Sequence, residues 1–387
     1  MSSSEEITAD DLISWEEKAF EAVGQAKSDA TLASKFYAYL WTAQRDFVAL
    51  SSQTQGRFCG DIGVISREVT CLFFSESCPQ PMSDGSDRYS EAVADLVLAK
   101  ITQRMEQDKK TAQSYEIKEG DRFWKSIGTF KGIDAGSWQT WLIRSGSQFR
   151  LPPPPGYGSR EDQAQLRAVK STLANITDKQ KKAIAFWATG PGTKTAPGTW
   201  LKVASDAMRD NAMHLETILL LRSVLAMILA DTEIAAMDSK YTHWVMRPYM
   251  RDKTILTFVP TPNHPSYPSE HAAIAGASPV FHRHHHPIER DRYRDGFQGH
   301  RLLGTQHRFK ASALRLPARP KLLGSRSRLD FEGLMFPNSR NRSSPSCGVQ
   351  RPSTMPARSS SGHSVRSSAC PPRYSALITR TGPAALT

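Results

Sequence analysis

Apolar residues recur at helical spacing through most of the first 280 positions of the chain. Leu32, Phe36 and Leu40 fall on one face of a helix, and residues 92–105 repeat the same i, i+3, i+4 period. The longest stretch of this kind, residues 213–246, is rich in Leu, Ile, Met and Ala and contains neither proline nor glycine. The pattern predicts an all-α protein, a helical bundle with residues 213–246 as its scaffold helix.

Prolines and glycines interrupt this pattern at two points. Residues 75–87 hold two prolines and a glycine, a composition typical of a turn or linker. Residues 151–158 read LPPPPGYG, which cannot form a helix and which we interpret as a connector that wraps between helices. The chain then divides into N-terminal helices over residues 1–80, a helical domain over residues 81–280 and a tail over residues 281–387.

The end of the scaffold helix and the start of the next helix can both be placed from prolines. Pro248 disfavours helical geometry at Arg247, so the scaffold helix should end near that arginine. A loop follows as far as Tyr267. Ser269, directly after Pro268, has the position and the side chain of an N-cap, so we expect a further helix to begin there.

The composition changes sharply after residue 280. Residues 281–387 contain none of the eight tryptophans and hold 19 Lys and Arg against 5 Asp and Glu, which leaves 31 basic and 33 acidic residues before them. The net charge of +12 therefore belongs to this tail. The helix predicted from Ser269 breaks off at Pro279 after fewer than three turns. We interpret the tail as disordered or, preferably, as the translation of a shifted reading frame.

Two features of the tail look like binding sites but have simpler explanations. The sequence HRHHH at residues 282–286 has the ligand type of a transition-metal site, yet in such a tail it is accidental, and we expect no metal site. The positive charge of the tail attracts nucleic acid without specificity, but aromatic residues for base stacking are sparse there. We therefore expect no specific nucleic-acid partner.

The sequence contains neither a secretory signal nor a membrane span. Residues 1–20 are acidic and polar, and the longest apolar run, residues 215–230, is interrupted by Glu216 and Arg222. That run is shorter than the roughly 20 residues that cross a bilayer. We expect a cytoplasmic protein with no membrane contact. The five cysteines have no metal-ligand spacing, so they are expected to be free thiols.

Candidate chemistry is concentrated at the end of the scaffold helix and at the start of the next one. Lys240 and Arg247 are seven residues apart, a spacing that brings two cations to nearly the same face of a helix. Such a pair in isolation is usually two solvated charges. Ser269, Glu270 and His271, however, place a hydroxyl, backbone amides and an imidazole at a helix N-terminus, which favours an anion. The combination predicts an oxyanion site.

Two segments carry a family resemblance. Residues 240–248, KYTHWVMRP, and residues 261–272, TPNHPSYPSEHA, resemble the first two signature motifs of vanadium-dependent haloperoxidases and of the related type 2 phosphatidic acid phosphatases. The resemblance extends more loosely from residue 190 to residue 200 and back to the proline run. It implies a helical bundle with an anion site at its core and vanadate as the cofactor.

The resemblance also implies a role for each residue of the site. Lys240 and Arg247 would bind the equatorial oxygens of the oxyanion, and Ser269 with the backbone amide of Glu270 would hydrogen-bond them. His271 would be the acid/base group. Family members usually have glycine where this chain has Glu270. A carboxylate at this position weakens oxyanion binding unless it points away from the site.

Two further positions concern the halide and the third motif of the family. The resemblance places His264 as a halide-pocket candidate, although a loop histidine followed by proline is more often structural. The third motif contains an arginine and, six residues later, a histidine that binds vanadium or attacks phosphorus. Arg294 with His300, and Arg301 with His307, have this spacing. A tail so rich in arginine and histidine produces such pairs by chance, so neither is assigned.

Three functions therefore follow as hypotheses. The first is a vanadium haloperoxidase-like oxidoreductase that uses hydrogen peroxide to oxidise a halide at bound vanadate. The second is an acid phosphatase of the same superfamily that hydrolyses a phosphomonoester with the same residues. The third is a catalytically inactive, truncated homologue that lacks the third motif. The absence of membrane spans favours the first over the second, and the sequence leaves open whether the chain forms a homo-oligomer.

Overall fold

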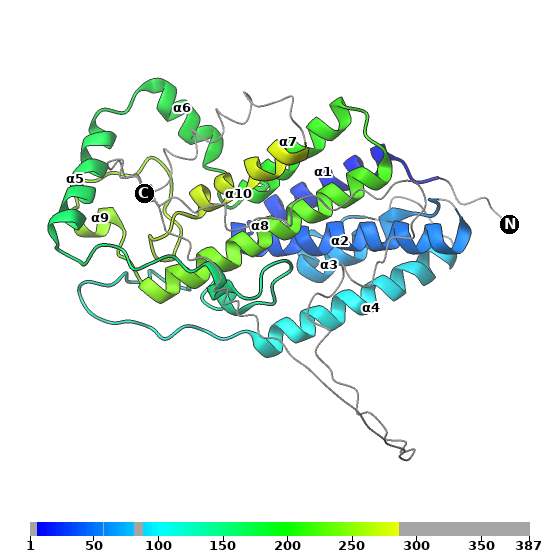
Figure 1. Ribbon diagram of the computed structural model, residues 1–387, viewed down its shortest axis with the longest axis horizontal. Coiled ribbons are helices and arrows are strands. Elements are labelled where there is room, and N and C mark those ends of the chain that lie inside the picture. The colour runs from blue at the N-terminus through cyan, green and yellow to red at the C-terminus, as the bar shows by residue number, and fades with distance from the viewer. Residues whose placement is uncertain (1–5, 57, 81–87, 286–387) are drawn as a thin grey trace, which may run out of the picture. The chain divides into compact units, whose positions relative to one another are not determined.

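The computed structural model of the chain is built from helices and the loops that join them (Figure 1). It describes residues 6–56, 58–80 and 88–285, with side chains as far as residue 278, and in this part every regular element is helical. The elements are α1 (Ala9–Gln25), α2 (Ala30–Gln55), α3 (Ile62–Phe73), η1 (Ser75–Ser77), α4 (Arg88–Thr111), η2 (Ala135–Ser137), η3 (Gly146–Phe149), α5 (Arg160–Ala174), α6 (Asp178–Trp187), α7 (Thr195–Asp210), α8 (Leu215–His243), α9 (Pro248–Arg251) and α10 (Glu270–His285). The predicted all-α class is confirmed.

Helix α8 is the centre of this arrangement. It packs along α2, with α7, α10, η2 and η3 around the rest of its surface, so that almost all of its last three-quarters is buried (Figure 1). The main hydrophobic core combines side chains from α1 to α4 with side chains from α6, α7, α8 and α10. The N-terminal helices and the helices that carry the predicted motifs therefore share one core.

A buried ion pair lies within this core. Arg222 on α8 donates to Glu16 on α1 at 2.8 Å, and Ser205 on α7 hydrogen-bonds the same carboxylate. Burial raises the pKa of Glu16, and the positive charge of Arg222 opposes this shift. A buried pair of this kind is costly to break, because removing one partner leaves the other charged and desolvated. It ties three helices together at the end of the bundle remote from the predicted site.

Irregular chain covers the side of α8 that helices leave open. Asp231 accepts three backbone N–H groups from this chain, those of Trp141, Leu142 and Ile143, at 2.8, 2.6 and 3.0 Å. Further along α8, Arg150 forms two 2.7 Å hydrogen bonds with Asp238. Carboxylates on α8 thus supply the acceptors that the extended segment cannot find within itself.

The proline-rich segment predicted as a wrapping connector lies against the end of α8. It is not helical, and the backbone N–H of Leu151 donates to Ser239 at 3.3 Å. The hydroxyl of Tyr267, in the loop before α10, donates to the carbonyl of Pro152 at 2.9 Å. The segment therefore joins the end of α8 to the loop that carries the second motif.

Helix α8 ends earlier than the sequence predicts. Its last residue is His243, and Trp244 adopts a left-handed conformation with a φ of 53° while its N–H still donates to the carbonyl of Lys240. The indole of Trp244 is buried against Trp124 and Phe130, and this packing turns the chain off the helix before Pro248 acts on it. The helix therefore ends four residues before Arg247, near which the sequence predicts its end.

Helix α10 ends later than predicted. It begins at Glu270 as expected but continues through Pro279 to His285. A proline removes one backbone donor from a helix, but burial of Ile274, Ala275 and Ala277 holds the preceding turns in place. The expected end of this helix at Pro279 is therefore wrong. The interpretation of the tail as disordered or as a shifted reading frame stays a prediction. The tail itself, from residue 286 onwards, lies outside the described residues.

One pair of cysteines departs from the expectation of free thiols. Cys71 and Cys78 form a disulfide, because the turn after α3 and the short helix η1 bring their Cα atoms to 4.7 Å. Cys59 is a free, buried thiol as predicted. The remaining two cysteines lie outside the described residues.

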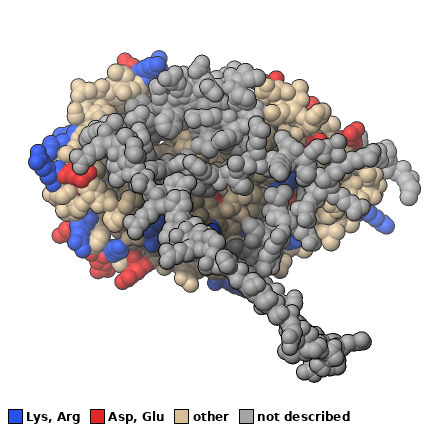
Figure 2. All heavy atoms as spheres, in the orientation of Figure 1, with Lys and Arg blue, Asp and Glu red and all other residues tan. Residues whose placement is uncertain are grey.

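The apolar length of the described helices and the charge on the face in view can both be compared with the sequence. None of the described helices is both long enough and apolar enough to cross a membrane. Where described residues are visible in Figure 2, basic and acidic side chains are interspersed along the edge. This agrees with the near balance of charge in residues 1–280.

Replacing Asp231 should destabilise the fold. Asp231→Ala leaves three backbone N–H groups without an acceptor next to the central helix, so we expect the free energy of unfolding to fall by about 2–4 kcal/mol. Chemical denaturation of the full chain measures this. Asp95→Ala, at an exposed position on α4, is the control and should change it by less than about 0.5 kcal/mol. Equal effects of the two substitutions would contradict the role assigned to Asp231.

Candidate functional site

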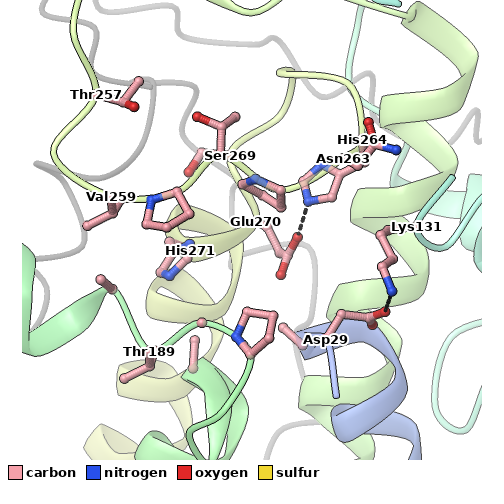
Figure 3. A pocket seen from close by; sticks show the side chains of 18 of the residues that line it. Asp29, Lys131, Thr189, Thr257, Val259, Asn263, His264, Ser269, Glu270 and His271 are labelled. Carbon is pink, nitrogen blue, oxygen red and sulfur yellow. Dashed lines mark ion pairs between the residues drawn. The ribbon is translucent and has the colours of Figure 1, made fainter. Parts of the chain in front are cut away.

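The six residues singled out in the sequence line one cavity of about 280 Å³ (Figure 3). They are Lys240, Arg247, His264, Ser269, Glu270 and His271. The cavity also contacts the start of α2, the segment between α6 and α7, and the loop after α9. Elements that are distant in sequence therefore meet here, at the end of α8 and the beginning of α10.

Ser269 caps helix α10 as the sequence predicts. Its side-chain oxygen accepts the N–H of Ala272 at 3.2 Å, and its carbonyl accepts the N–H of Ala273 at 3.0 Å. An accepting hydroxyl keeps its own hydrogen for donation. The first turn of α10 therefore faces the cavity with a hydroxyl donor and with the positive end of the helix dipole.

Lys240 is buried at the floor of the loop that carries the second motif. Its Nζ donates to the carbonyls of Pro268 at 2.6 Å and Pro265 at 3.0 Å, and it lies 3.5 Å from the carbonyl of Ser266. Burial and the positive charge of Arg247 lower its pKa to about 7. The ammonium group thus fastens the loop over residues 262–268 to helix α8.

Arg247 holds the other end of the same loop. It donates through Nε to the carbonyl of His264 at 3.0 Å and through one Nη to the carbonyl of Pro262 at 3.2 Å. That Nη also lies 3.0 Å from Nδ1 of His264. Burial lowers the pKa of Arg247 to about 10, so the guanidinium remains charged at neutral pH. Because Arg247 is the N-cap residue of α9, its convergence with Lys240 comes from the turn at Trp244 and not from a shared helix face.

Glu270 points into the cavity, not away from it (Figure 3). Its side chain is 12% exposed, and one carboxylate oxygen lies 3.1 Å from Nε2 of His264. Burial alone would raise the pKa of Glu270, but the hydrogen bond from His264 and the neighbouring positive charge of Lys240 act in the opposite direction and lower the pKa to about 2. Burial and the charge of Lys240 lower the pKa of His264 to about 4. The site thus contains an ionised carboxylate held by a neutral imidazole.

His271 lies on the first turn of α10 and faces the segment between α6 and α7. Burial lowers its pKa, and the negative charge of Glu270 and backbone hydrogen bonds with Ala188 and Trp187 act in the opposite direction. A lowered pKa favours the neutral imidazole at pH 7. His271 is therefore suited to accept a proton from a group bound in the cavity.

Three charged residues near the site were not predicted from the sequence. Asp29 is the N-cap of α2, where it accepts the N–H of Leu32, and Lys131 lies 3.9 Å from it at the rim of the cavity. Glu233 is fully buried on α8, with the hydroxyl of Thr31 3.4 Å from its carboxylate, and burial raises its pKa well above the ordinary value. Glu233 precedes Lys240 by seven residues, a spacing that could have identified it.

The charges of the cavity nearly balance. Lys240, Arg247 and Lys131 are cationic, Asp29 and Glu270 are anionic, and the raised pKa of Glu233 favours its uncharged form. Most donors on the two buried cations already bind backbone carbonyls. The site can therefore receive a small anion, but the anion must share these donors with the loop and must lie close to Glu270.

Comparison with known proteins finds matches in structure but none in sequence. No protein-family model matches the chain, and no curated protein matches it in sequence. A bacterial vanadium-dependent iodoperoxidase matches it in structure with a TM-score of 0.60 at 18% identity, over 73% of this chain and 82% of that chain. The holo form of a bacterial vanadium-dependent chloroperoxidase matches it with a TM-score of 0.52 at 13% identity, over the same fractions of the two chains. The structural resemblance to vanadium haloperoxidases expected from the two motifs is confirmed.

Loss of Lys240 should loosen the loop over residues 262–268. Lys240→Ala removes the donor for the carbonyls of Pro265 and Pro268, so we expect the free energy of unfolding to fall by about 2–4 kcal/mol. Hydrogen exchange of the loop amides should become faster. Lys182→Ala, at an exposed position on α6, should change neither quantity. Unchanged exchange in the loop of the Lys240 variant would contradict the fastening role.

Proposed function

We propose that the cavity binds a tetrahedral oxyanion, vanadate, and that the protein oxidises a halide with hydrogen peroxide. The observation that carries this proposal is the convergence of Lys240, Arg247, Ser269 and His271 on one cavity at the N-terminus of α10. These are two cations, a hydroxyl donor and a neutral imidazole, which is the donor set that an oxyanion requires. The likeness of the fold to haloperoxidases supports the same proposal.

The residues present fit vanadate in charge and donor type. Lys240 and Arg247 would hold equatorial oxygens of the anion, and Ser269 with the backbone amide of Glu270 would hydrogen-bond them. Bound vanadate would supply Lewis acidity that activates hydrogen peroxide toward a halide, without a change in its own oxidation state. The carboxylate of Glu270 would repel a bound anion, so vanadate would have to bind beside this negative charge.

Proton transfer would be the task of His271. Its lowered pKa leaves the ring neutral at pH 7, so Nε2 or Nδ1 can take a proton from hydrogen peroxide and return it to the leaving oxygen. His264 remains the halide-pocket candidate, because it lines the cavity. Its ring is also engaged with Arg247 and Glu270, which limits its freedom to respond to a halide. The two tail pairs considered for the third motif lie outside the described residues.

Vanadate should distinguish this function from that of a phosphatase. We expect vanadate-dependent oxidation of bromide or iodide by peroxide, and we expect His271→Ala to lower its rate about 100-fold or more. The rate of triiodide formation or of phenol bromination measures this, with Lys182→Ala as the unaffected control. Hydrolysis of a phosphomonoester that vanadate inhibits would instead favour the acid phosphatase. If the folded chain shows neither activity, the third hypothesis, a catalytically inactive homologue, is supported.

Affinity for an oxyanion should fall as the pH rises through about 7. Lys240 carries its charge below its pKa of about 7 and loses it above that pH. Burial and Arg247 lower this pKa, while Glu270 and Glu233 act in the opposite direction. The two histidines of the cavity, whose pKa values are also lowered, are neutral at pH 7.

Sulfate is the suitable probe for this dependence, because its own charge does not change near neutral pH. Calorimetric titration of the full chain at several pH values should show weaker binding at each step above pH 7. Lys240→Arg, whose side chain stays charged, should remove the pH dependence. Sulfate affinity that does not vary with pH in the unmodified chain would argue against contact between the anion and Lys240.

A further inference from the structure

The residue that departs from the family pattern is also the one that balances the charge of the cavity. Glu270 is the first residue of α10, and its carboxylate lies inside the cavity lined by Lys240, Arg247 and His271 (Figure 3). Acidic residues are common in the first turn of a helix, where they normally extend into solvent. This one is 12% exposed and is paired with a buried histidine.

We infer that Glu270 is a built-in counter-anion, which neutralises the buried cations of the site and which a bound oxyanion must displace or repel. The inference rests on the proposed oxyanion site and names the residue that controls its affinity. It makes the empty site stable and the anion-bound site less favourable than it would be with glycine or glutamine at this position.

The carboxylate is held in place by a short chain of contacts. Nδ1 of His264 lies 3.0 Å from an Nη of Arg247, which can only donate, and 3.1 Å from the carbonyl of Pro265, which can only accept. In the tautomer that pairs with the carboxylate of Glu270, Nδ1 accepts from Arg247 and makes no hydrogen bond with Pro265. A neutral imidazole then carries its hydrogen on Nε2, which lies 3.1 Å from the carboxylate of Glu270. The guanidinium, the imidazole and the carboxylate form one connected series. Moving Glu270 out of the cavity therefore breaks a buried hydrogen bond.

The two buried cations of the site also require a neighbouring negative charge. Lys240 and Arg247 are both buried. The charge of Arg247 lowers the pKa of Lys240, and the negative charge of Glu270 acts in the opposite direction on the pKa of both cations. Two buried like charges are unfavourable unless an anion lies between or beside them. Glu270 is the anion that the described part of the chain supplies to both. A bound oxyanion would also neutralise Lys240 and Arg247, so it competes with the carboxylate of Glu270 for these cations.

Removing the carboxylate should therefore tighten oxyanion binding. We expect Glu270→Gln and Glu270→Gly to bind orthophosphate and monomeric orthovanadate about tenfold more tightly or better, since each removes a like charge at close range. Calorimetric titration of the full chain measures the dissociation constants. Glu106→Gln, which removes one negative charge from an exposed position on α4, controls for net charge. Glu270→Asp keeps the carboxylate and should retain weak binding.

Thermal unfolding gives a readout that does not depend on catalysis. Without added anion, Glu270→Gln should unfold at a lower temperature than the unmodified chain, because Lys240 and Arg247 lose their counter-anion. Phosphate should restore the melting temperature of this variant by a larger increment than it gives the unmodified chain. The Glu106 control should behave as the unmodified chain does.

The unmodified chain provides a test that does not depend on how the variants fold. Saturating phosphate should change the signals of the His264 imidazole in nuclear magnetic resonance spectra of histidine-labelled protein, because Glu270 leaves Nε2 or is repelled from it. Phosphate that binds without changing these signals overturns the inference.

The outcomes separate the two proposals. Tighter binding by the Gln and Gly variants, with weak binding by the Asp variant and the Glu106 control, supports the counter-anion. Equal binding by the unmodified chain and the Glu270 variants overturns the inference and leaves the oxyanion site standing. Absence of phosphate and vanadate binding from every folded variant overturns the oxyanion site and the counter-anion together.

Discussion

Burial of two positive charges at the end of α8 is the constraint on which the functional end of this protein depends. Lys240 and Arg247 cannot be solvated there, so their donors must find oxygen acceptors within the fold. The carbonyls of the loop over residues 262–268 provide most of them. Prolines at positions 260, 262, 265 and 268 keep this loop irregular, so its carbonyls can turn toward the two cations.

The same constraint shapes the cavity. A loop pinned at both ends by cations delivers Ser269 and the first turn of α10 to a fixed place beside the end of α8. The cavity then has positive charge on one wall and helix amides on another, which is an environment for a small anion. Glu270 provides that anion from within the chain. An oxyanion bound as proposed would use the same donors that hold the loop, so tighter anion binding would come at the expense of structural stability.

Similarity of fold does not establish that the site has the same chemistry. The helical arrangement matches that of bacterial vanadium haloperoxidases at identities of 18% and 13%, which shows how much sequence change the bundle tolerates while its helices still pack. Within this fold the carboxylate of Glu270 contributes one negative charge to the cavity. Function has to be argued from the charges and donors of the cavity itself.

The sequence by itself determined the helical class, the scaffold helix, the N-cap at Ser269 and six of the residues that meet in the cavity. Apolar periodicity and capping are local properties, so they can be read along the chain. Tertiary structure alone decided that α8 ends at His243, because the burial of Trp244 is what turns the chain. It also brought Asp29 and Lys131 to the cavity from positions more than 100 residues away from the motifs. Above all, it decided that the carboxylate of Glu270 points inward, since the imidazole and cations that hold it there come from three other segments, and no pattern along one chain shows how they meet in space.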